Sequence, residues 1–543
     1  MALNISDSHD IEDIKIENNI VNGVHLDLVE NPNIGELIID NLNRHLDHIA
    51  QIEVETDKET RFADMKDKSS RCGLWMQNEK IGLGDIIIIC SHNHSDVYVP
   101  IFAAFYLGAS VSGWDYEISL KSAQHLIKFF KPKLIFSCES AVNTILEAAK
   151  LEQIQTTIIV FGKHSNVQSL DDILENHAIE KVQSFQPRKV KDPNTTAIIV
   201  LTSGSTSAPK GVIHSYKNVS ICIQTYLAYP FKNVCLWYST VYWVTGMILL
   251  LQTFFALGTR IIHKIWNVDD FCRVIQKYKV QRIFAAPTVF NHLCKSDALT
   301  KYNLESLEYV CIGGSKLSAV VMKVLREKLP KASIVQVYGS SETNRLITSQ
   351  SKNSNNLNTV GYPAPNTQVK IVDVKTKETL GANQPGEICV KQTNLMLGYF
   401  NNLELTKQVI DEQGWLHLGD EGFYDNNGEI TIIGRYKDMI KCRNFCISPT
   451  DLEDILLSHP AVVEVAVVPI PHSIDVEQPI AFVKRRAKVS EEELVNMTLV
   501  LGENTKLRGG VEFVDELPKL PTGKIDKQQL KKLALTIAGK RSS

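Results

Sequence analysis

The chain has no apolar segment long enough to cross a lipid bilayer. Its longest apolar stretch runs from Met247 to Leu257 and is interrupted by Gln252, whereas a spanning helix needs about 18 apolar residues. The first residues are polar and acidic, unlike a secretory signal. The final Arg541-Ser-Ser543 is not a Ser-Lys-Leu peroxisomal signal. We therefore expect a cytoplasmic protein without a transmembrane segment.

Cysteine is scarce, and neither sign of charge dominates. The 11 cysteines among 543 residues are too sparse for a disulfide framework and fit free thiols in a reducing compartment. Neither Cys442 with Cys446 nor His92 with His94 has the further partners that a structural zinc site requires. The formal net charge of -3 gives no electrostatic reason to expect nucleic acid as a partner.

The chain does have the composition of a large globular protein, with 44% hydrophobic and 22% charged residues. Between residues 80 and 200, continuous apolar runs alternate with helical segments such as 94–107. Runs of this kind are typical of strands buried on both faces, and their alternation with helices indicates parallel sheets in an α/β body. The predicted strands are 85–90, 133–137, 157–161 and 196–201.

The pattern of apolar and turn residues changes in the last third of the chain. From about Asn366, short alternating strands predict a smaller β-rich lobe. Beyond Arg435, a short α+β pattern predicts a second compact unit. Its elements are expected at 450–458, 463–469, 491–499 and 527–538. We predict an N-terminal domain over 1–434, a boundary at 435–437 and a C-terminal domain over 438–543.

One segment suggests phosphate chemistry. Thr202-Ser-Gly-Ser-Thr-Ser-Ala-Pro-Lys-Gly211 leaves the predicted strand 196–201, so its backbone N–H groups are free at the end of that strand. Five hydroxyl side chains, a glycine that allows close approach and Lys210 make a cradle for polyphosphate. The segment is not a Walker A loop, because its lysine follows Pro209. A solvated, serine-rich surface loop is the alternative.

Further segments follow this one in a fixed order between about residue 311 and 526. They are Cys311-Ile-Gly-Gly-Ser-Lys-Leu317, Gln336-Val-Tyr-Gly-Ser-Ser-Glu-Thr343, Gly414-Trp-Leu-His-Leu-Gly-Asp420, Gly434-Arg-Tyr-Lys-Asp-Met-Ile-Lys441 and Leu517-Pro-Lys-Leu-Pro-Thr-Gly-Lys-Ile-Asp526. With the phosphate segment, they resemble the adenylate-forming superfamily of acyl- and aryl-CoA ligases, insect luciferases and peptide-synthetase adenylation domains. One such match can arise by chance, but not the whole set in order.

The resemblance implies that the chain binds ATP with Mg²⁺. A carboxylate such as Glu342 is a hard oxygen ligand for the metal, and Thr206 is the second implied metal position. Gly314 would let the backbone lie against adenine, Tyr338 would stack on the base, and Asp420 would accept hydrogen bonds from the ribose. Taken alone, these residues also fit a tight turn, a core tyrosine and a turn aspartate. The implied ATP-binding residues are Thr202, Ser203, Gly204, Ser205, Thr206, Lys210, Gly314, Ser315, Tyr338, Gly339, Ser341, Asp420 and Arg435.

Two lysines are implied to serve different half-reactions. Lys524 would stabilise the charge that develops on the α-phosphate while the substrate carboxylate attacks. Lys441 would be brought in for thioester formation with coenzyme A, after a mobile domain 438–543 rotates about a hinge at Lys437. Taken alone, Lys524 would be a solvated lysine before a predicted amphipathic helix.

Three positions depart from the family pattern. Ser207 stands where a glycine is usual and Ser341 where a threonine is usual. Asn444 replaces a glycine beside which the pantetheine arm of coenzyme A passes in the family. A side chain at this position would narrow the thiol tunnel, so the resemblance supports the coenzyme A step less strongly than adenylation.

The acid-binding side also departs from the luciferases. Tyr242-Trp243 stands where luciferases and many relatives carry two histidines, and Trp243-Val-Thr-Gly246 resembles acyl-CoA synthetases of short acids. Trp243, Gly246 and Gly313 would form an apolar acyl pocket. Arg345 would line this pocket and recognise a second acidic group on the substrate. A core aromatic residue and a surface arginine are the alternatives.

The function that the resemblance implies is an ATP- and Mg²⁺-dependent ligase that joins a small fatty or aryl carboxylic acid to coenzyme A. Two alternatives stay open. The segment 507–518 resembles insect luciferases, which favours an oxygenase acting through an adenylate. The departures Ser207 and Asn444 favour a nucleotide-binding relative without catalytic activity. Family analogy keeps a peroxisomal location open. The sequence leaves the acid and the oligomeric state undetermined.

Overall fold

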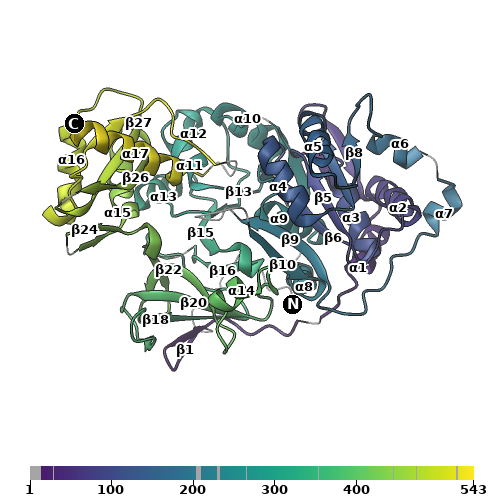
Figure 1. Cartoon of the computed structure of the whole chain (residues 1–543), viewed down its shortest axis with the longest axis horizontal. Helices are drawn as coiled ribbons and strands as arrows, with labels where there is room; N and C mark the ends of the chain where they lie inside the picture. The colour runs from purple at the N-terminus through teal and green to yellow at the C-terminus, as the bar shows by residue number, and fades with distance from the viewer. Residues whose placement is uncertain are drawn as a thin grey trace.

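The computed structural model describes residues 14–28, 30–175, 177–202, 210–228, 233–264, 266–352, 354–443, 445–472, 474–520 and 524–542. Over these ranges, helices cover four β-sheets. Figure 1 shows two α/β layers on the right and in the centre, a β-rich sheet below them, and the C-terminal unit at the upper left. No helix within the described ranges combines the length and the apolar character needed to traverse a membrane.

The first α/β layer is built on a sheet with the order β21-β10-β9-β6-β5-β7-β8. Its strands are β5 (Ile86–Cys90), β6 (Ser110–Trp114), β7 (Leu134–Cys138), β8 (Thr157–Phe161), β9 (Thr196–Thr202), β10 (Lys210–Ser215) and β21 (Gly398–Tyr399). Strands β5 to β9 pair in parallel, and β10 runs antiparallel to β9. The predicted phosphate segment therefore connects β9 to β10 at one end of this sheet.

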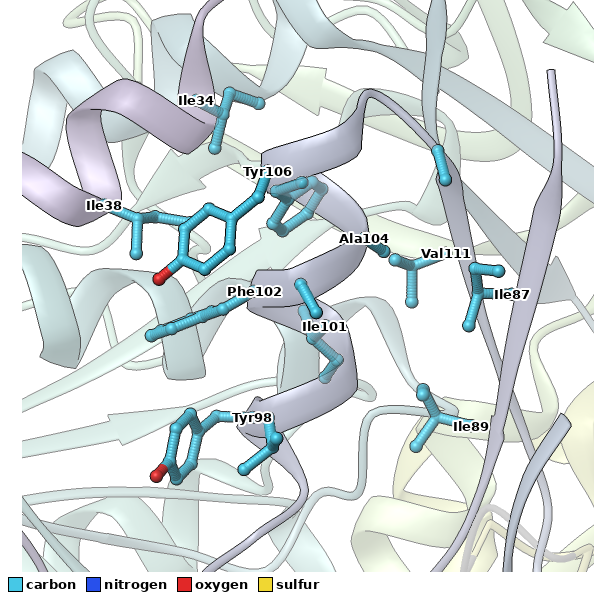
Figure 2. Packing of buried hydrophobic residues seen from close by; sticks show 14 of the residues in the cluster. Ile34, Ile38, Ile87, Ile89, Tyr98, Ile101, Phe102, Ala104, Tyr106 and Val111 are labelled. Carbon is cyan, nitrogen blue, oxygen red and sulfur yellow. The ribbon is translucent and has the colours of Figure 1, made fainter. Parts of the chain in front are cut away.

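Helix α3 (Tyr98–Leu107) is the centre of the largest hydrophobic core, and all of its residues are buried. Its sequence is apolar on every side, as expected for a helix with no solvent-facing surface. In Figure 2, Ile87 and Val111 of the sheet lie on one side of α3, and Ile38 of α1 (Ile34–Arg44) lies on the other. Helix α2 (Phe62–Asn78) also packs on α3. The layer is thus rigidly filled around its parallel strands.

The second α/β layer has the strand order β17-β16-β15-β14-β13-β11-β12-β3-β4. The bounds are β3 (Ile49–Glu53), β4 (Lys58–Arg61), β11 (Val234–Trp237), β12 (Thr259–Ile262), β13 (Arg282–Ala285), β14 (Tyr309–Ile312), β15 (Ser333–Gly339), β16 (Leu346–Ser349) and β17 (Tyr362–Pro363). The strands from β3 to β15 in this order are parallel. One face of the sheet packs against α10 (Val268–Tyr278), α11 (Pro287–Cys294) and α13 (Ala319–Lys328). Part of the opposite face, on β11, β13, β14 and β15, lines a cavity, whereas β12 contacts α9 (Val244–Phe255).

The β-rich sheet is antiparallel and includes strands from both ends of the N-terminal region. Its strands are β1 (Lys15–Glu17), β2 (Ile20–Asn22), β18 (Thr367–Val372), β19 (Thr379–Leu380), β20 (Gly386–Gln392), β22 (Leu416–Tyr424) and β23 (Ile430–Arg435). A short 3-10 turn, Tyr436–Asp438, follows β23 and leads into the C-terminal unit.

The C-terminal unit has its own sheet and its own hydrophobic clusters. It comprises β24 (Ile440–Cys442), β25 (Phe445–Ile447), α15 (Pro449–Ser458), β26 (Val462–His472), β27 (Val476–Arg485), α16 (Glu491–Thr498), β28 (Val511–Phe513) and α17 (Lys527–Ser542). The remaining α-helices are α4 (Leu120–Phe130), α5 (Glu139–Glu152), α6 (Leu170–Glu175), α7 (Ile179–Gln183), α8 (Tyr216–Ala228), α9 (Val244–Phe255), α12 (Ala298–Lys301) and α14 (Leu403–Val409).

The predicted fold class is confirmed: parallel-sheet α/β subdomains, a β-rich lobe and a small α+β unit at the C-terminal end are all present. Strand β8 has the predicted bounds, and the other predicted strands of the first layer agree to within a residue. The helix predicted over 94–107 ends at Leu107 as expected. It begins later than predicted, at Tyr98, because residues 95–97 form a turn that precedes the helix.

Candidate functional site

A cavity of about 1590 Å³ lies where the second α/β layer, the β-rich sheet and the C-terminal unit meet. Most of the residues predicted for the site line it, although they come from widely separated segments. Those residues are Thr202, Lys210, Trp243, Gly313, Gly314, Ser315, Tyr338, Gly339, Ser341, Glu342, Arg345, Asp420, Arg435, Lys437 and Lys524. The predicted Ser203, Gly204, Ser205 and Thr206, and the departures Ser207 and Asn444, fall outside the described residues.

Asp420 forms the anionic centre of one cavity wall. It is buried on β22, and its carboxylate accepts a hydrogen bond from the Tyr338 hydroxyl and an ion pair from Arg435, with Arg435 Nε at 2.8 Å from Asp420 Oδ1. Asp420 and Arg435 face each other across the β22–β23 pair. Burial and the neighbouring Asp420 carboxylate raise the pKa of Tyr338 well above its usual value, and Asp420 also raises the pKa of Arg435. The wall therefore presents a carboxylate held in place by two donors.

Glu342 lies in a short 3-10 turn, Ser341–Thr343, that follows β15. The Tyr399 hydroxyl donates to Glu342 Oε1 at 2.8 Å. The Lys210 ammonium lies 5.5 Å from the centroid of the same tyrosine ring. The carboxylate and the cation thus share the side of the cavity where β9 ends and β10 begins, and an oxygen ligand of this kind fits a magnesium ion.

The chain segment before Glu342 is supported by a buried histidine. His214 Nε2 lies 2.8 Å from the carbonyl oxygen of Ser341, so this nitrogen carries the proton and donates. Burial lowers the pKa of His214 to about 4, although the bond to Ser341 partly opposes the shift. His214 is therefore neutral at physiological pH and acts as a support of the turn.

Lys524 enters the cavity from the C-terminal unit. Its Cε lies 3.7 Å from the position that a Cβ on Gly314 would take, and Gly314 has a φ of +97°. The side chain is open to the cavity interior but surrounded by protein. Burial lowers the pKa of Lys524, and the nearby Arg435 lowers it further, while Asp420 partly offsets both effects. The ammonium, the glycine turn and the Asp420–Arg435 pair thus converge on one region.

Polar contacts between the C-terminal unit and the second α/β layer hold Lys524 in this position. Lys316 Nζ lies 3.1 Å from Asp454 Oδ2. His292 Nε2 of the second layer lies 2.8 Å from Glu464 Oε1 of the C-terminal unit, and Lys519 Nζ, from the same unit as Glu464, lies at the same distance. Burial of Glu464 opposes ionisation, but these two partners outweigh it and lower the pKa of the carboxyl to about 2. The carboxylate therefore stays charged and joins the two parts of the molecule.

Two predicted residues do not line the cavity. Lys441 is exposed on β24, and its backbone N–H donates to Glu477 Oε2 at 2.8 Å. Gly246 is buried in α9, where an added Cβ would lie only 1.9 Å from the carbonyl oxygen of Thr240. Gly246 thus allows α9 to pack closely behind the cavity wall. Trp243, which precedes α9, forms part of that wall, and its ring centroid lies 4.5 Å from that of Tyr242.

The other two predicted pocket residues do line the cavity. An added Cβ on Gly313 would meet Val337 Cγ2 at 2.9 Å and the Phe284 ring at 3.3 Å, so a side chain here would fill the space beside the glycine turn. The guanidinium of Arg345 donates to the carbonyl oxygen of Pro365. This contact ties Arg345 to the backbone at one end of the cavity.

A separate cluster of potential metal ligands lies on the β-rich sheet. Among the described residues, only Glu387, Cys389 and His417 bring three such donors within 4.8 Å of one another. His417 Nδ1 lies 2.9 Å from Glu387 Oε2 and 3.4 Å from Cys389 Sγ, and His417 Nε2 lies 3.6 Å from Asp411 Oδ2. The ligand atoms already satisfy one another, so the cluster is a hydrogen-bonded link between β20 and β22, the strand that carries Asp420.

Sequence reasoning missed several residues of the cavity. Tyr399, which lines the cavity and holds Glu342, comes from a segment without a recognised motif, and His214, which supports the turn without lining the cavity, was not singled out either. The strands β11 and β13, which belong to the cavity floor, contain none of the ordered segments, and β14 enters the segment Cys311–Leu317 only with its last two residues.

Comparison with models of known protein families supports the interpretation of the ordered segments. The chain belongs to the AMP-binding enzyme family: the model of that family matches residues 39–400, and the model of the AMP-binding enzyme C-terminal domain matches residues 451–524. The resemblance to the adenylate-forming superfamily is thereby confirmed.

Relatives within the family differ in activity. The chain is 30% identical over 510 residues to the luciferin 4-monooxygenase of Nipponoluciola cruciata, covering 89% of this chain and 91% of that protein. It is 26% identical over 508 residues to 4-coumarate-CoA ligase 1 of Narcissus pseudonarcissus, covering 90% and 92%.

Among the solved structures that resemble this chain are a luciferase-like enzyme and a CoA ligase. The luciferase-like enzyme of the nonluminescent mealworm Zophobas morio has a TM-score of 0.72 at 29% identity, covering 77% of this chain and 99% of that one. The anthranilate CoA ligase AuaEII in complex with anthranoyl-AMP has a TM-score of 0.86 at 20% identity, covering 95% and 99%, which shows a shared fold.

Proposed function

We propose that the protein is an acid–CoA ligase, which converts a carboxylic acid and ATP into an acyl-AMP and then into an acyl-CoA. The observation that carries this proposal is the convergence of Lys524, the Gly313–Gly314 turn and the Asp420–Arg435 pair in one cavity. Membership of the AMP-binding enzyme family and the CoA ligases among the relatives support it.

In the first half-reaction, an oxygen of the substrate carboxylate attacks the α-phosphorus of ATP, and pyrophosphate leaves as the bond to the bridging oxygen breaks. Two anions must approach each other, so a positioned ammonium stabilises the transition state more than the ground state. Lys524 supplies that charge beside Gly314, where the glycine leaves space for the ligand. Asp420 accepts hydrogen bonds from the ribose, and Thr202 and Lys210 of the phosphate segment lie on the cavity wall.

Magnesium fits the carboxylate of Glu342, which lies on the cavity wall and is oriented by Tyr399. When bound, the ion would neutralise phosphate charge and favour departure of pyrophosphate. Thr206 remains the second proposed metal position. Ser315, Gly339 and Ser341 are proposed to surround the nucleotide from the adjoining loops.

In the second half-reaction, the thiol sulfur of coenzyme A attacks the acyl carbon, and AMP leaves. Lys441, which lies outside the cavity, is proposed to replace Lys524 after the C-terminal unit rotates. The polypeptide passes from β23 to β24 through the turn Tyr436–Asp438, which supports a hinge at Lys437 between domains 1–434 and 438–543.

A pyrophosphate-release assay across short, medium, long-chain and aryl acids, with and without coenzyme A, tests the proposal. We expect magnesium-dependent pyrophosphate release with at least one class of acid and an acyl-CoA product detected by mass spectrometry. Absence of pyrophosphate release with every acid, in protein that binds ATP, would favour a non-catalytic relative. Pyrophosphate release without any acyl-CoA would restrict the activity to adenylation.

A second candidate is a luciferase-like oxygenase acting through an adenylate. The 29–30% identity to four luciferin 4-monooxygenases favours it, whereas Tyr242-Trp243 in place of the luciferase histidine pair argues against it. Light emission with luciferin, ATP and magnesium distinguishes the two candidates. We expect no light above that of a Lys524→Ala control.

A further inference from the structure

The floor of the cavity is one face of the second parallel sheet. Side chains along a strand alternate between faces, and the register places four cavity-lining residues side by side across β11, β13, β14 and β15. These residues are Cys235, Arg282, Tyr309 and Ser333. The next residue on each strand points the other way and belongs to the hydrophobic core under the helices. Those core residues are Leu236, Ile283, Val310 and Ile334.

Arg282 places a positive charge on the floor at the end away from the glycine turn. Its guanidinium carbon lies 4.4 Å from the centroid of the Tyr309 ring. Two residues further along the strands, toward the glycine turn, the floor consists of Trp237, Phe284 and other apolar residues. A substrate lying over this floor would meet an apolar surface first and a cation at the end.

Buried donors without a partner lie on and beside this floor. Among the described residues, Trp237 Nε1 and Ser333 Oγ make no hydrogen bond, and both residues line the cavity. Arg260, paired in register with Cys235 on β12, is 3% exposed, and its Nε likewise finds no partner in the described chain. Buried donors are nearly always satisfied in native proteins. Ser333 lies in the row of Arg282, whereas Trp237 lies two residues nearer to the glycine turn and Arg260 does not line the cavity, so the unsatisfied donor at the far end is the Ser333 hydroxyl.

The distance from this end to the reaction centre follows from strand geometry. Tyr309 precedes Gly313 by four residues on β14 and the turn after it, a separation of roughly 13 Å along a strand. The carboxylate to be activated belongs near Gly314 and Lys524 in the proposed function. A second acceptor group on the same molecule would therefore lie deeper in the cavity, beyond an apolar middle.

We propose that Arg282, with the hydroxyl of Ser333 in the same row, forms a subsite for a second carboxylate at the far end of the substrate. This inference rests on the proposed function and narrows its substrate class to dicarboxylic acids with an apolar middle. Arginine suits this role because its planar guanidinium donates two parallel hydrogen bonds to a carboxylate.

The test compares dicarboxylic acids with monocarboxylic acids of the same length in the pyrophosphate-release assay. In the wild type we expect kcat/KM for the best dicarboxylic acid to exceed that of its matched monocarboxylic acid by about 10-fold or more. Arg282→Met should lower kcat/KM for the dicarboxylic acid by about 10–100-fold, the range expected for a charge-assisted hydrogen bond. The same change should leave kcat/KM for the monocarboxylic acid unchanged or raise it.

Arg273→Gln is the matched control, because Arg273 pairs with Asp270 on the exposed surface of α10 and should change neither value. Arg282→Lys keeps the positive charge and should retain part of the preference for dicarboxylic over monocarboxylic acids. Calorimetric binding of the dicarboxylic acid gives a readout without turnover, and Ser333→Ala should weaken that binding several-fold. This variant also carries the test if Arg282→Met fails to fold.

Equal loss of both activities in Arg282→Met, or a wild-type preference for monocarboxylic acids at every length, would overturn the subsite and leave the proposed ligase intact. Protein that binds ATP but neither binds nor activates any acid would overturn the ligase and the subsite together. Retained binding of the dicarboxylic acid by Arg282→Met would overturn the subsite alone.

Discussion

Lys524 and Lys441 belong to the same small C-terminal unit but lie in different surroundings. Lys524 lies in the cavity beside Gly314, where burial and Arg435 lower its pKa. Lys441 is exposed on β24, outside the residues that line the cavity. Because the unit packs as one body around its own clusters, it presents one of these lysines to the cavity at a time. In the proposed function this arrangement serves adenylation, and the predictions below separate the two lysines.

The largest effect is expected for Lys524→Ala. Adenylation should slow by about 10²–10³-fold, a typical loss for one donor that acts in the transition state, while preformed acyl-AMP should still be converted to acyl-CoA. Pyrophosphate release and thioester formation are measured separately. Lys532→Ala, an exposed lysine on α17, serves as the matched control and should leave both rates unchanged. Equal impairment of both steps by Lys524→Ala would contradict the separation.

Lys441→Ala should produce the opposite pattern. Thioester formation from preformed acyl-AMP should fall by about 10²-fold, while pyrophosphate release stays near the wild-type rate, because Lys441 lies away from the cavity in the present arrangement. Single-turnover kinetics with the isolated adenylate provide the measurement. If both lysine variants impair the same half-reaction, the proposal that Lys524 and Lys441 act in different half-reactions is wrong.

A smaller effect is expected when a contact between the two parts of the molecule is removed. Lys316→Gln breaks the ion pairs to Asp454 and Asp451. It should slow adenylation by about 2–5-fold, in keeping with the modest energy of partly exposed ion pairs, without slowing the thioester step. Lys323→Gln on the exposed side of α13 is the control. A slower thioester step in Lys316→Gln would mean that this contact does not favour the adenylating arrangement.

The smallest effect concerns the pH dependence of adenylation. The ammonium of Lys524 is present below its pKa, which lies below the ordinary value of 10.5, so adenylation should decline as the pH rises through this lowered pKa. Asp420 opposes the shift, so Asp420→Asn should move the decline to lower pH at saturating ATP. Lys524→Arg should move it to higher pH. Rate profiles over the alkaline range check both directions, and a decline that neither substitution moves would have another origin.

The two α/β layers show why the sequence revealed one sheet more readily than the other. The strand Ile86–Cys90 lies in a sheet with helices on both faces, so its sequence is a continuous apolar run. In β13 (Arg282–Ala285), Ile283 packs in a core while Arg282 lines the cavity. A short strand with one face on a cavity has no long apolar run and was not predicted. The floor of the candidate site was missed for that reason.

The sequence by itself determined the family, the fold class and the positions of the ordered segments, because these depend on local patterns and on residue types at fixed spacing. It also identified Glu342, Asp420, Arg435 and Lys524 as candidate site residues. Only the tertiary structure decided which of the two lysines meets the cavity, that Gly246 packs behind its wall, and that Arg282 lies on its floor. These features depend on which strand faces and domain surfaces come together, and such contacts between distant segments have no local signature in the chain.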